Sequence, residues 1–288
     1  MDPSLDPATM DSQELYRLTR LMLRNYAINP RKALGQHFAV DANLIKTLVT
    51  AAKLEKSKTV LEIGPGLGFL TQALALRSKR VIAIEKDPLL ASLAQTELID
   101  IENVEVLCGD GLIVDLPNAD TFVSNLPFEI STPMTFRVLS EGLFERLAVS
   151  YQKEYALRTY AKPQSSDYGR LAVKLAYYGK FRTVKTFPPR SFYPSPKVAT
   201  SVVVAQLQTP PTIVGTAAFD WLLRTIFSRK HKNLRNTLLR AIRKQRVPQG
   251  VKILLSIADL EDLSIITRRA ISLSSSEILA LAEMLFPQ

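Results

Sequence analysis

The stretch Thr59-Val60-Leu61-Glu62-Ile63-Gly64-Pro65-Gly66-Leu67-Gly68 decides the fold, because a short apolar run leads directly into a glycine-rich turn. A run of this length, bounded by glycine, predicts a buried strand. The residues after Gly68 have a helical pattern, and glycine permits both a tight turn and a close approach of a ligand to the backbone. The stretch therefore predicts a strand–turn–helix unit with a candidate ligand loop at its centre.

The same alternation continues along the chain. Further apolar runs predict strands at residues 80–84, 104–108, 121–123 and 147–150, with helical patterns between most of them. Strands separated by helices at this spacing predict a doubly wound α/β fold with a parallel sheet.

The pattern changes after residue 170. Segments 171–178, 181–187 and 201–207 are predicted to be strands that form an antiparallel edge of the same sheet. The Thr209-Pro210-Pro211 break then marks a boundary, after which we expect a small all-α domain. The predicted regions are an N-terminal extension at 1–28, an α/β domain at 29–208 and a helical domain at 209–288.

The N-terminal extension carries one clear pattern. Residues 1–9 are predicted to be disordered, and residues 11–25 to form an amphipathic helix with one apolar and one basic side. Its apolar side carries Leu15, Leu18 and Met22, and its basic side carries Arg17, Arg20 and Arg24.

Composition excludes several classes of protein. The 288 residues are 47% hydrophobic, which allows a sizeable core, but no apolar run approaches the roughly 18 residues that span a bilayer. The polar, acidic N-terminus gives no sign of a secretory signal. One cysteine and two histidines argue against a disulfide, a zinc site and a serine–histidine triad. We therefore expect a cytoplasmic, metal-free protein.

Ligand-type residues follow four successive strands. Gly64 and Gly66 follow the first strand, Glu85 closes the second, Gly109-Asp110-Gly111 the third and Asn125-Leu126-Pro127-Phe128 the fourth. Each could be an ordinary turn or surface charge when taken alone. The carboxyl ends of parallel strands meet at one edge of a sheet, so together they predict a ligand site.

The glycine spacing indicates which kind of ligand the site could bind. Gly64, Gly66 and Gly68 are spaced Gly-x-Gly-x-Gly, not Gly-x-Gly-x-x-Gly as in dinucleotide binding. A pyrophosphate needs a helix N-terminus close by, whereas a nucleoside with an amino-acid tail needs only room. Glu85, at the end of the second strand, can accept hydrogen bonds from both ribose hydroxyls.

These motifs resemble class I S-adenosylmethionine-dependent methyltransferases. Within that class the chain is similar to the rRNA adenine N6-dimethyltransferases, which include KsgA-type enzymes of the small ribosomal subunit and the erythromycin-resistance methyltransferases. The motifs that carry the resemblance are Leu34-Gly35-Gln36-His37-Phe38, Glu62-Ile63-Gly64-Pro65-Gly66-Leu67-Gly68, Gly109-Asp110-Gly111, Asn125-Leu126-Pro127-Phe128 and Phe192-Tyr193-Pro194-Ser195-Pro196-Lys197-Val198.

The resemblance implies a Rossmann-like methyltransferase sheet and S-adenosylmethionine as cofactor. It implies a monomer that acts on small-subunit rRNA within a pre-ribosomal particle, without a metal or a membrane. His37 stands where the family often has Asn, and Ala39 where it often has Leu. The cofactor contacts that it implies are Gln36, His37, Ala39, Gly64, Gly66, Glu85, Lys86, Gly109, Asp110 and Asn125.

The catalytic motif in this resemblance is Asn125-Leu126-Pro127-Phe128. We expect the Asn125 side-chain oxygen and the Leu126 carbonyl to accept the two protons of an adenine N6 amine. Phe128, where Tyr is common, and Phe192 are expected to stack on the base. The base must leave its RNA stack to enter such a pocket.

Charge points to a polyanionic partner. Lys and Arg outnumber Asp and Glu by 37 to 27, and residues 221–258 contain no acidic residue. A solvated helix face is the ordinary explanation of such a run, but its length favours phosphate contact. The predicted RNA-binding residues are Arg31, Lys32, Lys197, Arg229, Lys230, Lys232 and Arg235.

Three alternatives to small-subunit dimethylation stay open. A large-subunit, erythromycin-resistance-type enzyme would share the same motifs, and a non-catalytic assembly factor would keep the fold. The intact Asn125-Leu126-Pro127-Phe128 motif argues against the non-catalytic reading. A DNA adenine methyltransferase usually has two prolines after the first motif residue, whereas here Leu126 comes first.

Overall fold

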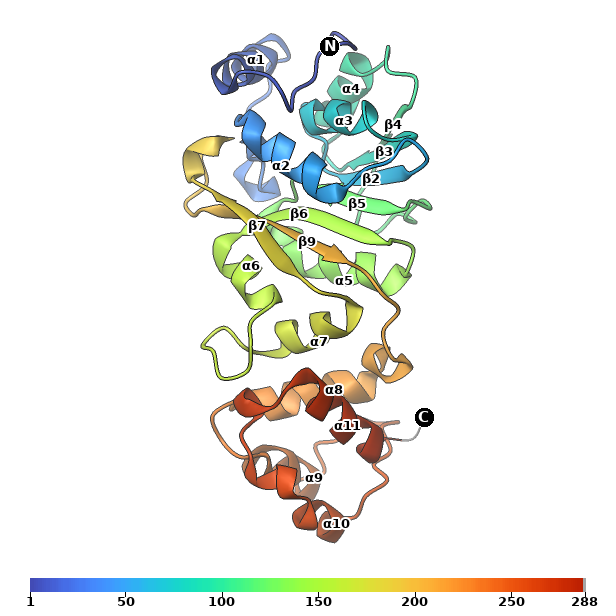
Figure 1. Cartoon of the computed structure of the whole chain (residues 1–288), viewed down its shortest axis with the longest axis vertical. Helices are drawn as coiled ribbons and strands as arrows, with labels where there is room; N and C mark the ends of the chain where they lie inside the picture. The colour runs from blue at the N-terminus through green and yellow to red at the C-terminus, as the bar shows by residue number, and fades with distance from the viewer. Residues whose placement is uncertain (287–288) are drawn as a thin grey trace. The chain divides into compact units, whose positions relative to one another are not determined.

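A computed structural model describes residues 1–286, apart from the side chain of Lys32. The chain divides into two compact units (Figure 1). Unit 1 comprises Met1–Ala156 and Arg182–Leu207, and unit 2 comprises Leu157–Phe181 and the chain from Gln208 onward. The N-terminal extension thus belongs to the α/β unit.

A seven-stranded sheet forms the centre of unit 1. Its strands lie in the order β4-β3-β2-β5-β6-β9-β7. The first five are mutually parallel, β9 is antiparallel to β6, and β7 is antiparallel to β9. The predicted doubly wound sheet with an antiparallel edge is therefore confirmed. The strands are β2 (Thr59–Ile63), β3 (Arg80–Glu85), β4 (Val104–Cys108), β5 (Thr121–Ser124), β6 (Arg146–Gln152), β7 (Arg182–Phe187) and β9 (Thr200–Gln206).

The strand order reverses between β2 and β5. The chain runs outward from β2 to β3 and β4, then returns to the other side of β2 with β5 and β6. Loops at such a switch point diverge and leave a crevice at the carboxyl ends of the strands, where open α/β sheets bind ligands.

Helices cover both faces of this sheet (Figure 1). On one face α2 packs against β5 and β6, α3 against β3, and α4 against β3 and β4, while α5 lies on the opposite face. Aspartates cap three of the helices as sequence favours: Asp11, Asp41 and Asp87 accept backbone N–H groups of α1, α2 and α4. The helices are α1 (Ser12–Asn25), α2 (Ala42–Ala52), α3 (Phe69–Ala75), α4 (Pro88–Glu97), α5 (Ser131–Glu141) and α6 (Lys153–Thr159).

The prediction that residues 1–9 are disordered is wrong. The side-chain amide of Gln72 donates to the carbonyl of Leu5 at 2.9 Å, and Asp6 forms an ion pair with Arg77. Ala8 is buried in the core. Composition did not reveal these contacts, because their partners lie some 70 positions further along the chain.

The predicted strand at 171–178 is also wrong, because the segment is helix α7 (Arg170–Tyr178). Its buried residues include Ala172 and Leu175, and Val173 and Tyr177, which recur at helical spacings of three and four. A short, nearly continuous apolar run does not distinguish a buried strand from a buried helix. The segment Leu157–Phe181, which contains α7, belongs to unit 2 and not to the α/β unit. The later boundary, between Leu207 and Gln208, lies next to the predicted one.

The regular elements of unit 2 are helices, joined by loops, and an isolated antiparallel bridge links Asn233 to Arg269 within its described residues. Two of its short helices begin with capping boxes, at Ser256 and Ser274. Its other helices after α7 are α8 (Ala217–Phe227), a π-helical turn (Arg235–Leu239), α9 (Arg240–Arg243), α10 (Ile257–Asp262) and α11 (Ser275–Leu285). Across the described chain, no helix has both the length and the apolar character required to cross a bilayer.

Candidate active site

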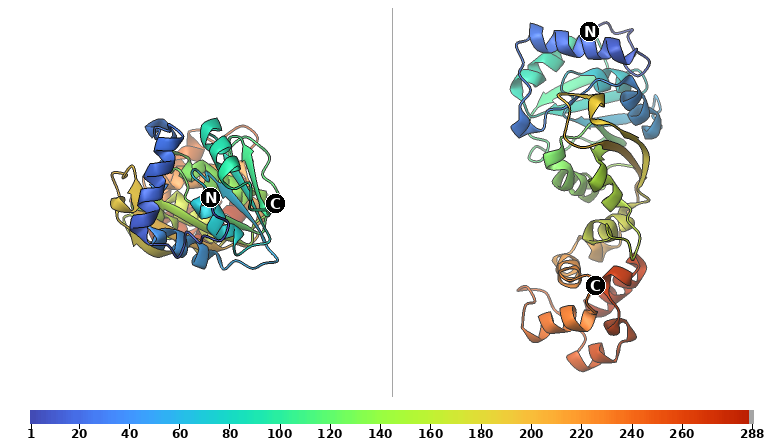
Figure 2. Two further views of the ribbon diagram at one scale, coloured as in Figure 1. Left: turned by 90° about the horizontal axis from the view of Figure 1, so that it is seen from above. Right: turned by 90° about the vertical axis from the view of Figure 1, so that its left-hand side faces the viewer.

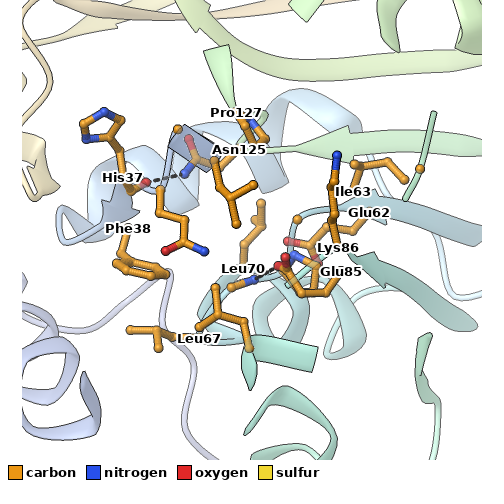
Figure 3. Close-up of a pocket in the computed structure, with 18 of the residues that line it drawn as sticks. His37, Phe38, Glu62, Ile63, Leu67, Leu70, Glu85, Lys86, Asn125 and Pro127 are labelled. Atoms are coloured by element: carbon orange, nitrogen blue, oxygen red, sulfur yellow. Dashed lines mark hydrogen bonds between the residues drawn. The ribbon is translucent and has the colours of Figure 1, made fainter. Parts of the chain in front are cut away.

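The carboxyl ends of the central strands surround a cavity of about 1100 Å³, which includes space open to solvent. Figure 3 shows His37 and Phe38 on one side of it and Glu62, Glu85 and Lys86 on the other, with Asn125 between them. The structure brings together most of the residues that the sequence assigned to a cofactor. Those that line the cavity are Gln36, His37, Ala39, Gly64, Gly66, Glu85, Lys86, Asp110 and Asn125, joined by Pro127 from the catalytic motif.

The glycine turn after β2 needs glycine for its backbone shape. Gly64 and Gly66 have φ angles of +75° and +56°, in the left-handed region that side chains disfavour. The N–H of Gly64 donates to the Ile84 carbonyl at 2.9 Å, and that of Gly66 donates to Glu85 Oε2 at 3.1 Å. A Cβ at Gly66 would lie 3.1 Å from the Phe38 ring. The turn is therefore bound to the end of β3.

Glu85 is held by the backbone at both carboxylate oxygens. Besides the bond from Gly66, its Oε1 accepts the N–H of Asp87 at 3.0 Å. Burial raises the pKa of Glu85, and these backbone donors oppose that rise. Each carboxylate oxygen retains a free acceptor position, so Glu85 can accept hydrogen bonds from a ligand in the cavity.

Glu62 is a second carboxyl on the cavity wall, and the sequence motifs did not assign it to the site. It is only 1% exposed, and its Oε2 has no hydrogen-bond partner among the described residues. Burial raises its pKa to about 8. The feature of the sequence that could have identified Glu62 is its position: it is a carboxylate inside an otherwise apolar strand, immediately before the glycine turn.

Lys86 and Asp110 form an ion pair at the rim. Lys86 Nζ lies 2.8 Å from Asp110 Oδ2, and the Leu112 N–H donates to Asp110 Oδ1 at 2.9 Å. The bond from Lys86 is the main reason why the pKa of Asp110 is lowered. Gly109 does not line the cavity; its N–H donates to the Glu85 carbonyl at 2.8 Å and holds the loop in place.

Gln36 lines the cavity, but both polar atoms of its side chain form hydrogen bonds with other residues. Its amide donates to Asp87 Oδ2 at 2.8 Å, and its oxygen accepts the N–H of Arg31 at 2.7 Å. These bonds fasten the segment before β1 (Phe38–Ala39) to the start of α4.

The Asn125 amide is fixed at both ends. Its nitrogen donates to the His37 carbonyl at 3.1 Å, and its Oδ1 accepts from the Ser150 hydroxyl at 2.6 Å. Ser150 is fully buried near the end of β6, which runs parallel to β5. An amide oxygen has two lone pairs, so Oδ1 can accept one more hydrogen bond from a ligand. Sequence reasoning missed Ser150 because it belongs to no motif.

Phe128 lies beside His37. Their rings stack with centroids 5.7 Å apart and planes 29° apart, and Phe128 is half-buried. The His37 Nδ1 donates to the Pro194 carbonyl at 2.6 Å. Leu126, by contrast, is buried.

Phe192, the other aromatic expected to stack on a base, does not present a free face in this structure. It is 2% exposed and forms part of the core, in strand β8 (Phe192–Tyr193), which pairs with β1. Its neighbour Tyr193 is half-buried and reaches the surface instead.

The predicted RNA-binding residues are divided between the two units. In unit 1, Lys197 is exposed, and Arg31 pairs with Asp87 at 3.6 Å while remaining 52% exposed. The side chain of Lys32 lies outside the described structure. In unit 2, Lys230 Nζ donates to the carbonyls of Ser166 and Tyr168, so it is committed to its own unit. Arg229, Lys232 and Arg235 are exposed.

Within the described residues, no group of three or more His, Cys, Asp or Glu side chains could hold a metal ion.

A mostly parallel seven-stranded sheet with an antiparallel edge, a glycine turn after β2 and a carboxylate at the end of β3 define a class I methyltransferase fold. The chain belongs to the ribosomal RNA adenine dimethylase family, whose model matches residues 27–272.

Relatives and solved structures agree with this family. The chain is 35% identical over 270 residues to a probable ribosomal RNA small subunit methyltransferase A of Methanosarcina acetivorans, covering 93% of this chain and 98% of the relative. A dimethyladenosine transferase from Plasmodium falciparum superposes with a TM-score of 0.76 at 28% identity, covering 87% of this chain and all of that one. The 23S rRNA methyltransferase ErmE superposes with a TM-score of 0.61 at 26% identity, covering 86% of this chain and 99% of that one.

Proposed function

We propose that the protein transfers methyl groups from S-adenosylmethionine to the N6 atom of adenosine in small-subunit rRNA and forms N6,N6-dimethyladenosine. The substrate we propose is two adjacent adenosines near the 3′ end of that RNA, within a pre-ribosomal particle. The observation that carries the proposal is the Asn125 amide, fixed by His37 and Ser150 on the wall of the strand-end cavity. Membership of the adenine dimethylase family supports it.

The cavity residues fit the cofactor. Glu85 is a buried carboxylate with free acceptor positions for a ribose diol, and Glu62 offers a buried oxygen without a partner in the described chain. Ile63, Leu67, Ile84 and Leu90 supply apolar walls for a nucleobase. When bound, S-adenosylmethionine supplies an electrophilic methyl group.

The protein's own contribution is to orient the amine. The N6 lone pair of adenine is delocalised into the ring, so the amine is a poor nucleophile. Asn125 Oδ1 and the Leu126 carbonyl would accept hydrogen bonds from its two N–H groups, which concentrates electron density on nitrogen and directs its lone pair into the cavity. One N6 proton would leave to solvent for each methyl group gained. Because Ser150 and His37 already hold the amide, no reorientation is needed when the base arrives.

Phe128 would hold the base by stacking, a contact that contributes about 1–3 kcal/mol. Its ring already stacks on His37, which Pro194 holds in turn. A second methyl transfer requires that the cavity accept monomethyladenosine. Pro127 lines the cavity beside Asn125, so it would set the room that is available.

Positive charge on unit 2 would supply affinity for the RNA backbone. Arg229, Lys232 and Arg235 are exposed there, in a stretch without acidic residues. Phosphate contacts of this kind are independent of sequence and weaken with salt.

The test is transfer of a labelled methyl group to small subunits that lack the modification, followed by mapping of the labelled nucleotides. Large subunits and DNA serve as parallel substrates. We expect label in small-subunit RNA on adenosine alone. Label in large-subunit RNA or in DNA would instead support the erythromycin-resistance-type or the DNA-directed alternative, and absence of any label would support a non-catalytic assembly factor.

A further inference from the structure

We infer that the outward face of α1 binds the phosphate backbone of the RNA that carries the target adenosine. The inference rests on the proposed function and adds a binding surface to it. The surface, called the α1 face below, consists of Tyr16, Arg17, Arg20 and Arg24.

Helix α1 is amphipathic, and the structure shows what each side contacts. Leu15, Thr19, Met22 and Leu23 are buried against unit 1. The three arginines follow spacings of three and four, so they lie along one stripe, and all three are exposed. The helix is therefore held by its apolar side and leaves its basic side free.

Two of these arginines have no partner within the described structure. Neither Arg17 nor Arg24 makes an ion pair or a side-chain hydrogen bond with any described residue, and both are exposed. Arg77 and Arg80 of the same unit are paired, with Asp6 and Glu105. Exposed guanidinium groups without intramolecular partners are well suited to bidentate recognition of phosphate.

Arg20 connects the α1 face to the cavity. Its guanidinium lies 4.9 Å from the centroid of Tyr193, and it donates to the Tyr16 hydroxyl at 3.2 Å. The next residue, Pro194, accepts the hydrogen bond from His37, which lines the cavity. Figure 2 shows α1 beside the segment that contains β8 in both views. Phosphates on this face would thus lie next to the entry of the target base.

A surface groove adds an aromatic contact. Tyr16 and the exposed Arg190 line an open hollow of about 1030 Å³ between α1, the start of α2 and the turn Pro189–Ser191. Tyr16 is 42% exposed, and its ring meets Tyr193 edge-on at 5.9 Å. Cationic and exposed aromatic side chains together are what single-stranded RNA binds.

The buried apolar side of α1 favours RNA over a membrane surface as the partner of the α1 face. An amphipathic helix that binds a membrane inserts its apolar side into the lipid. Here Leu15 and Met22 already pack in the protein core. The charge complementarity that remains is with the RNA substrate.

The test compares two variants that each remove two positive charges from unit 1. Arg17→Ala/Arg24→Ala changes the α1 face without breaking any described contact. Lys56→Ala/Lys79→Ala is the matched control, because both lysines are exposed and lie in the loops that precede β2 and β3, at the sheet edge opposite the cavity. Affinity for unmethylated small-subunit RNA and for S-adenosylmethionine is measured at several salt concentrations.

We expect the α1 variant to bind the RNA about tenfold more weakly, with the salt slope reduced by about 1 to 2, while cofactor affinity and the thermal unfolding midpoint stay unchanged. The control should bind within about twofold of the unaltered protein. Arg17→Lys/Arg24→Lys should have an affinity between those of the alanine variant and the unaltered protein, because it keeps both charges but loses the bidentate geometry. Equal losses in the α1 variant and the control would overturn the inference. So would an unchanged α1 variant, or one that loses binding to phosphatidylserine vesicles but not to RNA.

Failure of the proposed function gives a different result. In that case the unaltered protein transfers no methyl group to small-subunit RNA. The inference about α1 fails when the unaltered protein transfers methyl groups but the RNA affinity is indifferent to Arg17 and Arg24.

Discussion

The cavity and the basic surfaces of this protein are built in opposite ways. In the cavity, Glu85 and Asn125 are each held by two hydrogen bonds, at both carboxylate oxygens or at both ends of the amide. On the α1 face, Arg17 and Arg24 project from the surface with no partner in the described structure. Chemistry on one nitrogen atom needs fixed acceptors, whereas attraction to a phosphate backbone works over distance and tolerates mobile side chains. Changes in the cavity should therefore alter turnover or cofactor affinity, and changes on the basic surfaces should alter RNA affinity and its salt dependence.

The largest effect is expected from Asn125→Ala. Removing the side-chain acceptor for the N6 amine should lower turnover by at least about 100-fold. Single-turnover methyl transfer at saturating RNA measures this, and cofactor binding to the same preparation, which should change far less, shows that the cavity is intact. Undiminished turnover would remove Asn125 from the mechanism.

Glu85→Gln should act on the cofactor. The glutamine would direct an N–H₂ group at one of the backbone donors, Gly66 or Asp87, and would take away a charged acceptor. We expect affinity for S-adenosylmethionine to fall about 10- to 100-fold by calorimetry, with RNA affinity unchanged. Glu105→Gln, at a half-buried carboxylate of β4 that pairs with Arg80, is the control and should leave cofactor affinity unchanged. A loss of RNA affinity with normal cofactor binding would reverse the assignment.

Lys232→Ala/Arg235→Ala tests a basic surface instead of the cavity. Both side chains are exposed on unit 2, so their loss should weaken RNA binding about tenfold and reduce its salt slope. Turnover at saturating RNA should stay the same. A fall in turnover that extra RNA does not restore would mean that this surface takes part in catalysis.

Ser150→Ala tests whether orientation of the catalytic amide matters. It removes the 2.6 Å bond to Asn125 Oδ1 and should lower turnover about 3- to 10-fold, without effect on cofactor or RNA affinity. The matched control is Ser201→Ala, a buried serine on β9 that bonds Thr186 instead. Equal turnover losses in both variants would indicate a general packing effect.

Glu62 should make stability depend on pH. Its pKa of about 8 in the folded protein lies above the ordinary value of 4.5, because burial disfavours the charged form. Between these values the unfolded chain has lost the proton and the folded protein keeps it, so the free energy of unfolding should fall as pH rises, by at most about 1.4 kcal/mol per pH unit. Denaturation without cofactor at pH 5.5, 7 and 8.5 measures the slope. Glu62→Gln should flatten it, and an identical slope in both proteins would contradict the assigned protonation.

The sequence predicted the cavity well because its residues follow a rule of topology. Gly64, Glu85, Asp110 and Asn125 each come directly after an apolar strand, and parallel strands carry their carboxyl ends to one edge. Their order along the chain therefore translates into proximity in space.

The residues that sequence reasoning missed or misplaced depend on packing instead. Ser150 reaches Asn125 only because β6 lies beside β5, and no local pattern marks it. Phe192 was expected from the resemblance to stack on the base, but it lies in β8, which pairs with β1, and its side chain is buried. The apolar run of α7 fits a strand or a helix equally well until its neighbours are known.

The central claim is that the cavity presents the N6 atom of an adenosine for two methyl transfers. It is tested most directly by treating unmodified small subunits with the protein and S-adenosylmethionine, and then identifying the modified nucleosides by mass spectrometry. We predict N6,N6-dimethyladenosine in small-subunit RNA after treatment with the unaltered protein, and none after treatment with Asn125→Ala. A methyl group on another base or on a ring nitrogen, or dimethyladenosine formed equally well by Asn125→Ala, would contradict it.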